Sequence, residues 1–257
     1  MLKHIGILKP NTLVSVLNWE GIPLILIYIF SMLVYPWFCS SCDWKQVQSV
    51  WSHWQSLNVG MLAFLSSLIA FNISRFNAKN QRERDFVAAR AFLPEALSEL
   101  TTYLRSCSSV FSEAWTRAKA RETKSPLQAQ VPSLPEAYKS IFSRCISFAE
   151  PDVGEHLAYI LMRLQIHDSR LRGLTEGFSE GSSTMVMPQN IISHMYCLAQ
   201  LQALVNKTFG FARGLDEFNS SRLTLEEFRT AYINLDIQPE EYENLIGFTE
   251  RAVERND

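Results

Sequence analysis

One serine lies in a sequence pattern that is typical of a catalytic nucleophile. Gly177, Ser179 and Gly181 match the G-x-S-x-G sequence of α/β hydrolases, in which a strained turn between a strand and a helix exposes the serine hydroxyl. That chemistry also needs an acidic residue and then a histidine further along the chain, but no Asp or Glu lies between Gly181 and His194. The preceding sequence has a helical pattern, so we expect that Ser179 is not catalytic and that the protein is not an enzyme.

The acidic residues and histidines do not form a recognisable metal site. The segment 216–227 has the length of a calcium-binding loop, but Phe218 and Ser221 occupy positions where a ligand and the required glycine belong. A connection between two helices is the simpler interpretation. No histidines show zinc-binding spacing, and His156 and His167 each stand beside an acidic residue, as exposed pairs do. We expect no metal and no cofactor.

The cysteines include one closely spaced pair. Cys39 and Cys42 form a C-x-x-C sequence and could be oxidised to a disulfide outside the cytoplasm. A thioredoxin-like redox role needs a β-α-β context, which the sequence lacks, and the state of the pair stays open. Cys107, Cys145 and Cys197 fall in helical patterns, and we expect them to be reduced core residues.

Charged residues are distributed unevenly, although the overall composition is ordinary. The 257 residues are 47% hydrophobic and 19% charged, with a formal net charge of −2. Lys, Arg, Asp and Glu are nearly absent before Arg75 and frequent after it. Because the chain lacks the basic excess of nucleic-acid-binding proteins, we expect no direct nucleic-acid partner. The sequence therefore divides into an apolar part, 1–76, and a polar part, 77–257.

Two uncharged apolar runs in the first part have lengths that suit a membrane. Neither 22–38 nor 57–71 contains a charged side chain. A transmembrane helix needs about 20 such residues, and roughly 17 is the lower limit. We expect two spans, at about 20–38 and 55–76, with an outer loop at 39–54. A cleaved signal sequence is the alternative for the first run, but no small-x-small cleavage site follows it.

Basic residues around the two runs predict their orientation. Lys3 and Lys9 precede the first run, a basic cluster from Arg75 to Arg90 follows the second, and the loop between the runs contains only Lys45. The positive-inside rule then places both termini in the cytoplasm and the loop outside. We expect a multi-pass membrane protein.

Small residues line one face of the second run at spacings of three and four. Such a face lets another helix approach closely, and this packing drives helix association in lipid. The face consists of Gly60, Ala63, Ser67, Ala70 and Ser74, and Ser66 beside Ser67 adds a polar edge. Packing against the first run and oligomerisation, with a pore as one form of it, are the two interpretations.

Tryptophans recur at helical spacing in the expected loop. Trp44, Trp51 and Trp54 are accompanied by Val47 and Val50. A short helix here would place an aromatic stripe at the membrane–water interface, where tryptophan partitions. An anchoring aromatic belt and a membrane-perturbing element are the two interpretations of this stripe.

The polar part has helical periodicity and no convincing alternating strand. A stem is expected to continue through Arg90, and the clearest amphipathic helix starts near Pro94, with apolar residues at spacings of three and four through Ala118. Further helices are expected at about 134–149, 152–172 and 189–209, with a glycine-containing loop from Gly173 to Pro188. Thr224 and Glu227 form a capping-box pattern before a short helix, and Pro239 opens the last one.

The predicted fold class is all-α, with an N-terminal two-helix transmembrane hairpin and a C-terminal cytoplasmic helical domain. This layout, without a catalytic motif, resembles the two-transmembrane effector proteins of bacterial anti-phage defence systems, of the type that accompanies some retrons. The resemblance implies a bacterial inner (plasma) membrane protein that partners hold inactive and that arrests growth or kills the cell on infection. Its partners would be the lipid bilayer, a cytoplasmic protein and further copies of the chain.

A passive membrane anchor or scaffold that recruits cytoplasmic proteins is the alternative function. An ion-coupled transporter is disfavoured because neither apolar run, 22–38 or 57–71, contains a charged residue.

Overall fold

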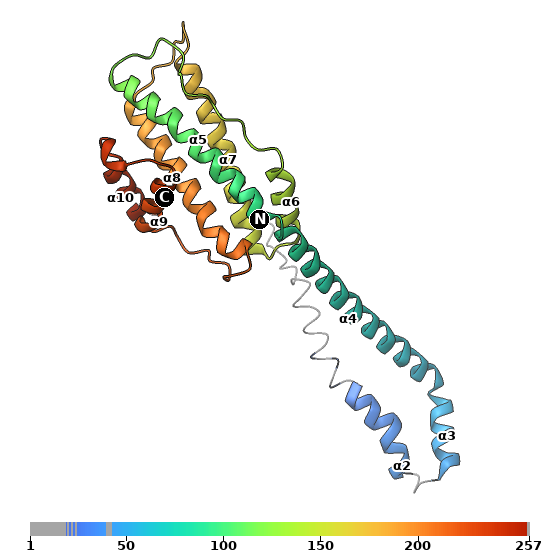
Figure 1. The fold of residues 1–257 in the computed structure, drawn as a ribbon. Coiled ribbons are helices and arrows are strands. Elements are labelled where there is room, and N and C mark those ends of the chain that lie inside the picture. Colours follow the sequence, from blue (N-terminus) through green and yellow to red (C-terminus); the bar gives the residue numbers. More distant parts are fainter. Residues whose placement is uncertain (1–18, 20, 22, 24, 40–42, 256–257) are drawn as a thin grey trace, which may run out of the picture. The chain divides into compact units, whose positions relative to one another are not determined.

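The computed structural model describes residues 19, 21, 23, 25–39 and 43–255 (Figure 1). Within these residues every regular element is a helix, which confirms the all-α prediction. The chain divides into two units, Met1–Asn77 and Ala78–Asp257.

The first unit contains short helices followed by the start of a long one. A π-helical turn, η1 (Phe30–Val34), leads into α2 (Tyr35–Cys39), and α3 (Trp44–His53) precedes α4 (Gln55–Arg90). The π turn lies immediately before Pro36, where a helix must deviate because proline has no N–H and crowds the preceding turn. The side chain of Asp43 caps α3 by accepting a hydrogen bond from the N–H of Lys45 at 3.0 Å.

Among the described residues, one helical run is long and apolar enough to cross a membrane. This run begins with α4 at Gln55, and none of its most apolar window is buried in the protein. It contains the second predicted span, 55–76. The first predicted span, about 20–38, is described as an uninterrupted helix only from Ile25 to Cys39, which is shorter than the bilayer core requires.

The second unit is a helical bundle. It contains α5 (Leu93–Lys119), α6 (Tyr138–Phe148), α7 (Pro151–Gly177), α8 (Pro188–Ala212), α9 (Leu225–Asn234), the 3₁₀ turn η2 (Pro239–Glu241) and α10 (Leu245–Arg255). The long helices α5, α7 and α8 lie side by side, and α8 contacts α5, α7, α9 and α10 (Figure 1). Buried residues occur on nearly all sides of α8, as expected for a helix that others surround.

The end of α4 belongs to this bundle from Ala78 onward. Ala89 is buried in its core and Phe86 packs against that core. Arg82 donates hydrogen bonds from Nε to the carbonyl of Phe148 at 3.0 Å and from Nη2 to the carbonyl of Ala149. These bonds satisfy carbonyls at the end of α6, where the helix itself supplies no donor.

The apolar periodicity identified the buried face of α5 correctly. Pro94 lies in its first turn, and Leu97, Leu104 and Phe111 are fully buried. The expected helix near Thr224 is also present, and Thr224 and Glu227 form the reciprocal bonds of a capping box. The buried face of α5 and the capping box of α9 each depend on residues that are close together in the sequence.

Three predicted boundaries were wrong. The helix expected from residue 134 begins at Tyr138, because Pro132 and Pro135 favour extended backbone before it. The loop expected at Gly173 begins only after Gly177, since the cost of about 1 kcal/mol for a helical glycine is small beside packing energies. Pro239 opens only a 3₁₀ turn, and the last helix starts at Leu245.

Candidate functional sites in the two units

Some members of the tryptophan stripe in the first unit pack against other side chains, and others are exposed. The ring of Trp44 lies 5.8 Å from that of Trp37 and 5.9 Å from that of Trp51. Val47, on the same face of α3, is fully buried, whereas Trp54 is 47% exposed. Part of the predicted interface stripe therefore joins α3 to α2, and Trp54 keeps an exposed indole.

Trp51 also makes a specific hydrogen bond to the preceding segment. Its indole Nε1 donates to the carbonyl oxygen of Met32 at 2.8 Å. The N–H that an α-helix would place on this carbonyl belongs to residue 36, which is a proline and has none. Trp51 thus provides a donor to a carbonyl that Pro36 cannot satisfy. In hydrocarbon, an unsatisfied backbone group costs several kcal/mol.

A second polar contact joins the segment 25–39 to α4. The hydroxyl of Tyr28 donates to Oδ1 of Asn58 at 2.7 Å. Asn58 is the first of a row of half-buried residues on α4 at spacings of three and four. This row marks the side of α4 that faces Tyr28. The row continues with Met61, Leu65, Leu68 and Asn72.

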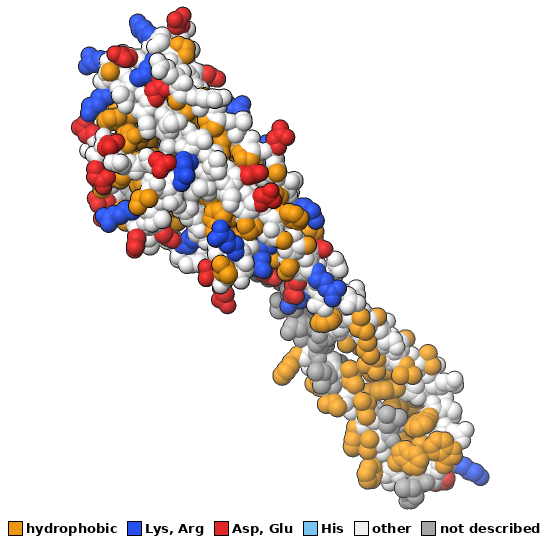
Figure 2. All heavy atoms as spheres, in the orientation of Figure 1, with side chains coloured by type: hydrophobic (Ala, Val, Ile, Leu, Met, Phe, Trp, Pro, Cys, Tyr) orange, Lys and Arg blue, Asp and Glu red, His pale blue; other side chains and the backbone are white. Residues whose placement is uncertain are grey.

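The small-residue face predicted on the second span lies on the opposite side of α4, at 3.6 residues per turn. All of its members are exposed: Gly60, Ala63, Ser66, Ser67, Ala70 and Ser74. A side-chain carbon added at Gly60 would meet no atom within 4 Å. The hydroxyls of Ser66 and Ser67 donate to the carbonyls of Leu62 and Ala63 at 2.8 and 2.9 Å. The small-residue face is open, and exposed apolar side chains are frequent on the side of this unit that Figure 2 shows.

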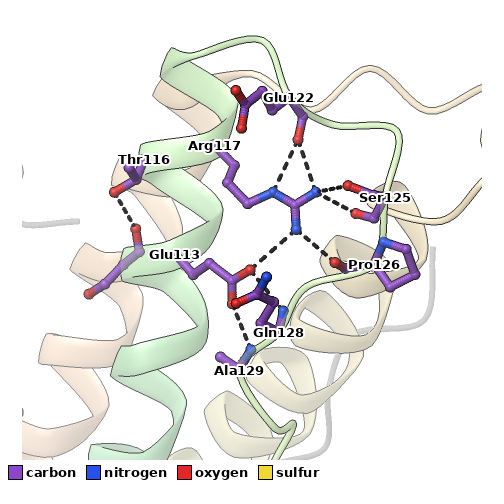
Figure 3. A network of polar contacts seen from close by, with 9 residues as sticks. Glu113, Thr116, Arg117, Glu122, Ser125, Pro126, Gln128 and Ala129 are labelled. Carbon is purple, nitrogen blue, oxygen red and sulfur yellow. Dashed lines mark hydrogen bonds and ion pairs between the residues drawn. The ribbon is translucent and has the colours of Figure 1, made fainter.

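In the bundle, an ion pair organises the extended segment that follows α5 (Figure 3). Nη1 of Arg117 lies 3.2 Å from Oε1 of Glu113, one turn earlier on the same helix. The remaining guanidinium hydrogens go to the hydroxyl of Ser125 and to backbone carbonyls that close the turn after α5. These carbonyls belong to Glu122, Ser125 and Pro126.

The carboxylate of Glu113 also binds the extended segment that follows α5, at residues 128 and 129. It accepts the N–H of Gln128 at 2.8 Å and that of Ala129 at 2.6 Å. Burial alone would raise the pKa of Glu113, but these two N–H groups and Arg117 outweigh burial and hold the pKa below its usual value. The pair therefore fixes the strap, which we define as residues 122–129, to the surface of α5.

Beyond the strap, the chain forms one wall of an open groove of about 1070 Å³. Residues 130–136 face α5 across it, and the α5 side carries hydroxyls from Thr102, Ser106 and Ser109 together with the carboxylate of Glu99. The groove surface is mixed in character, because Val131, Pro132 and Leu134 add apolar area to these polar groups.

His167 is not the exposed partner of Asp168 that the sequence suggested. It is 4% exposed, with its ring 6.0 Å from that of Tyr103 and 5.8 Å from that of Phe111. Burial, and then the charges of His194 and Arg170, lower the pKa of His167 to about 4. The histidine is therefore a neutral core residue at pH 7.

The sequence did contain a signal for this burial. His167 lies three residues after Leu164 and four before Leu171, on the inward face of α7. Its acidic neighbour points elsewhere, since Asp168 forms an ion pair with Arg172 at 2.9 Å. Adjacent residues on a helix do not face each other, so the proximity of His167 and Asp168 in sequence was misleading.

The sequence motifs that resemble chemical sites lie in ordinary connections. Ser179 is in the turn after α7, and its hydroxyl donates to the carbonyl of Glu176 at 2.7 Å. No strand precedes it, so the elbow geometry of a hydrolase is missing from this part of the described chain. The segment 216–227 connects α8 to α9 and enters α9, as interpreted from the sequence. Among the described residues, no group of three His, Cys, Asp or Glu side chains could hold a metal ion.

The described cysteines are free thiols. Cys107 and Cys145 are buried, and burial raises their pKa values to about 12 and about 11. The sulfur of Cys197 is half-buried and accepts a hydrogen bond from Arg170. Cys39 is exposed, and Cys42 lies outside the described residues, so the question whether the two form a disulfide stays open.

No protein-family model matches this sequence, and no curated protein and no solved structure matches it.

Proposed function

We propose that this chain is a non-enzymatic effector of the bacterial inner (plasma) membrane, whose helical domain lies in the cytoplasm and whose apolar unit perturbs the bilayer. One helix of the required length and composition supports the membrane location. The observation that carries the effector role is the exposed row from Gly60 to Ser74, because it leaves a close-packing helix face available to another copy.

In this proposal the segment at about 20–38 provides a second crossing, which gives a hairpin with both termini in the cytoplasm. The bond from Tyr28 to Asn58 and that from Trp51 to Met32 support this arrangement. They satisfy polar groups inside the apolar unit, as a lipid environment requires.

The bundle is the regulatory part of the proposed effector. A cytoplasmic protein partner binds it and holds the effector inactive until infection, as the resemblance to anti-phage effectors implies. The groove beside residues 130–136 is large enough for a peptide segment of such a partner.

Expression of the full chain in bacterial cells tests the effector role. We expect the wild-type chain to depolarise the membrane and stop growth, as measured with a potential-sensitive dye and by culture density. Gly60→Leu, Ala63→Leu and Ser67→Leu should each abolish both effects, because a branched side chain blocks close helix approach. Leu62→Phe and Ile69→Phe add bulk at exposed positions outside the row and serve as matched controls that should retain both effects.

The alternative function is a passive anchor that recruits cytoplasmic proteins. It would be favoured if the chain stayed in the membrane fraction while potential and growth remained normal, both with and without phage infection. Equal loss of activity in the control variants would contradict the role assigned to the small-residue row.

A further inference from the structure

One wall of the groove beside α5, residues 130–136, has an unpaired backbone. Pro132 and Pro135 fix their own φ angles and favour extended conformations in the residues before them, Val131 and Leu134. Among the described residues, none of the backbone N–H and C=O groups of 130–136 takes part in a hydrogen bond. Backbone groups without a partner in the protein bind water or a ligand, so this wall is free to pair with another extended chain.

The α5 wall of the groove presents hydrogen-bond acceptors. The hydroxyls of Thr102, Ser106 and Ser109 each donate their hydrogen to a carbonyl one turn earlier on α5, at 3.1, 3.0 and 2.9 Å. A hydroxyl that already donates its hydrogen has only lone pairs left for a ligand. A ligand that satisfies this wall must therefore bring donors.

The charged side chains of the groove are both negative. Glu99 and Glu136 are the charged residues that line it, and no Lys or Arg lines it. Glu99 is half-buried, Glu136 is exposed, and neither forms an ion pair with a described residue. A cationic side chain brought into the groove would therefore be attracted by two carboxylates and would meet no lining cation. The charge of the groove selects a positive ligand.

We propose that the groove binds an extended peptide with Lys or Arg side chains, supplied by the cytoplasmic partner. The peptide backbone pairs with residues 130–136, and its cationic side chains contact Glu99 and Glu136 and donate to the hydroxyls of α5. Apolar side chains of the peptide contact Val131, which is 41% exposed. The inference rests on the proposed function for the source of the peptide, and it adds the chemistry by which that partner is recognised.

Calorimetric titration of the full chain in non-ionic detergent micelles tests the site with three probes. The first is the peptide acetyl-Arg-Val-Arg-Val-Arg-amide, the second has Glu in place of each Arg, and the third is the basic peptide with methylated backbone nitrogens. We expect saturable binding of the basic peptide and at least about tenfold weaker binding of each of the other two, because one reverses the charge and the other lacks main-chain donors. Binding of the acidic or the methylated peptide as tight as that of the basic peptide would overturn the proposal.

Neutralisation of the groove gives an independent test. The double variant Glu99→Gln, Glu136→Gln keeps the size of both side chains and should weaken binding of the basic peptide about five- to tenfold. Glu180→Gln, Glu240→Gln removes the same charge at exposed positions outside the groove and should leave binding nearly unchanged. Circular dichroism checks that both double variants remain helical. Absence of saturable binding at millimolar concentrations, or equal affinities of the two folded double variants, would disprove the site.

The titration and the depolarisation assay fail separately. A chain that binds the basic peptide but leaves membrane potential and growth normal would keep the peptide site and contradict the effector role. A chain that depolarises cells but does not bind the peptide would keep the effector role and contradict the peptide site.

Discussion

Trp51 and Pro36 form a pair of residues whose effects should depend on each other. Trp51→Phe keeps the ring but removes the donor to Met32, so backbone amides in the segment 25–39 should exchange with solvent about five- to tenfold faster, as a lost bond of about 1 kcal/mol implies. Pro36→Ala restores a backbone N–H four residues after Met32. In the Pro36→Ala background, Trp51→Phe should therefore have little effect.

Hydrogen-exchange mass spectrometry of the chain in lipid nanodiscs measures both effects. Trp44→Phe is the matched control, since its indole nitrogen has no hydrogen-bond partner among the described residues and the ring packing is kept. If Trp51→Phe accelerated exchange equally in the wild-type and Pro36→Ala backgrounds, the indole would not be compensating for the proline.

His167 should make the bundle sensitive to acid. Its pKa is about 4 in the folded protein and about 6.5 when unfolded, so the unfolded state binds more protons between these values. The stabilising contribution is complete above the unfolded pKa and is lost as the pH falls. Between pH 7.5 and 5, we expect the free energy of unfolding to fall by about 1–2 kcal/mol through this residue.

Urea denaturation of the full chain at the two pH values measures this loss. His167→Phe has no proton to bind, so its stability should fall less over the same range. His53→Phe changes an exposed histidine and should behave as the wild type. Identical pH dependence in the His167→Phe and wild-type chains would show that His167 is not the acid-sensitive group.

At the scale of elements, the strap depends on Glu113 and Arg117. Glu113→Gln replaces the carboxylate by an amide that cannot accept both strap N–H groups and also receive Arg117, so the strap should open more often. We expect cleavage by trypsin after Arg121 or Lys124 to become several-fold faster, with a loss of about 1–3 kcal/mol in bundle stability.

Electrophoresis of timed trypsin digests follows this cleavage. Glu83→Gln removes an exposed ion pair with Lys79 at 3.7 Å and should leave the cleavage rate unchanged, because such pairs contribute little. Unchanged cleavage in Glu113→Gln would mean that apolar contacts of the strap, rather than this network, hold it in place.

For the whole molecule, the flanking charges make a topological prediction. Alkaline phosphatase fused after Asp257 should be inactive, because it folds only outside the cytoplasm, whereas a fluorescent protein at the same position should be active. Removal of Lys3 and Lys9 should not move the bundle to the outer side of the membrane, since the larger basic cluster follows the second predicted span. Phosphatase activity from the wild-type fusion would place the bundle on the outer side.

Local chemistry was sufficient to predict several features of the fold. The uncharged run at 57–71 identifies the membrane-length helix, the apolar spacing after Pro94 identifies the core face of α5, and Thr224 with Glu227 identifies a helix start. Each depends on residues within one or two turns of each other, so their spacing alone carries the information. The division of the chain into an apolar and a polar part follows from composition in the same way.

Other features depend on contacts between helices that are distant in the sequence. The face of α4 turned toward Tyr28 contains Asn58 rather than Gly60, and Trp51 binds a carbonyl from a different helix. The sequence of α7 made His167 compatible with burial, but only the rings of Tyr103 and Phe111 make it a core residue. The periodicity of a helix specifies which residues share a face, whereas the partner that covers that face is specified by distant segments of the chain.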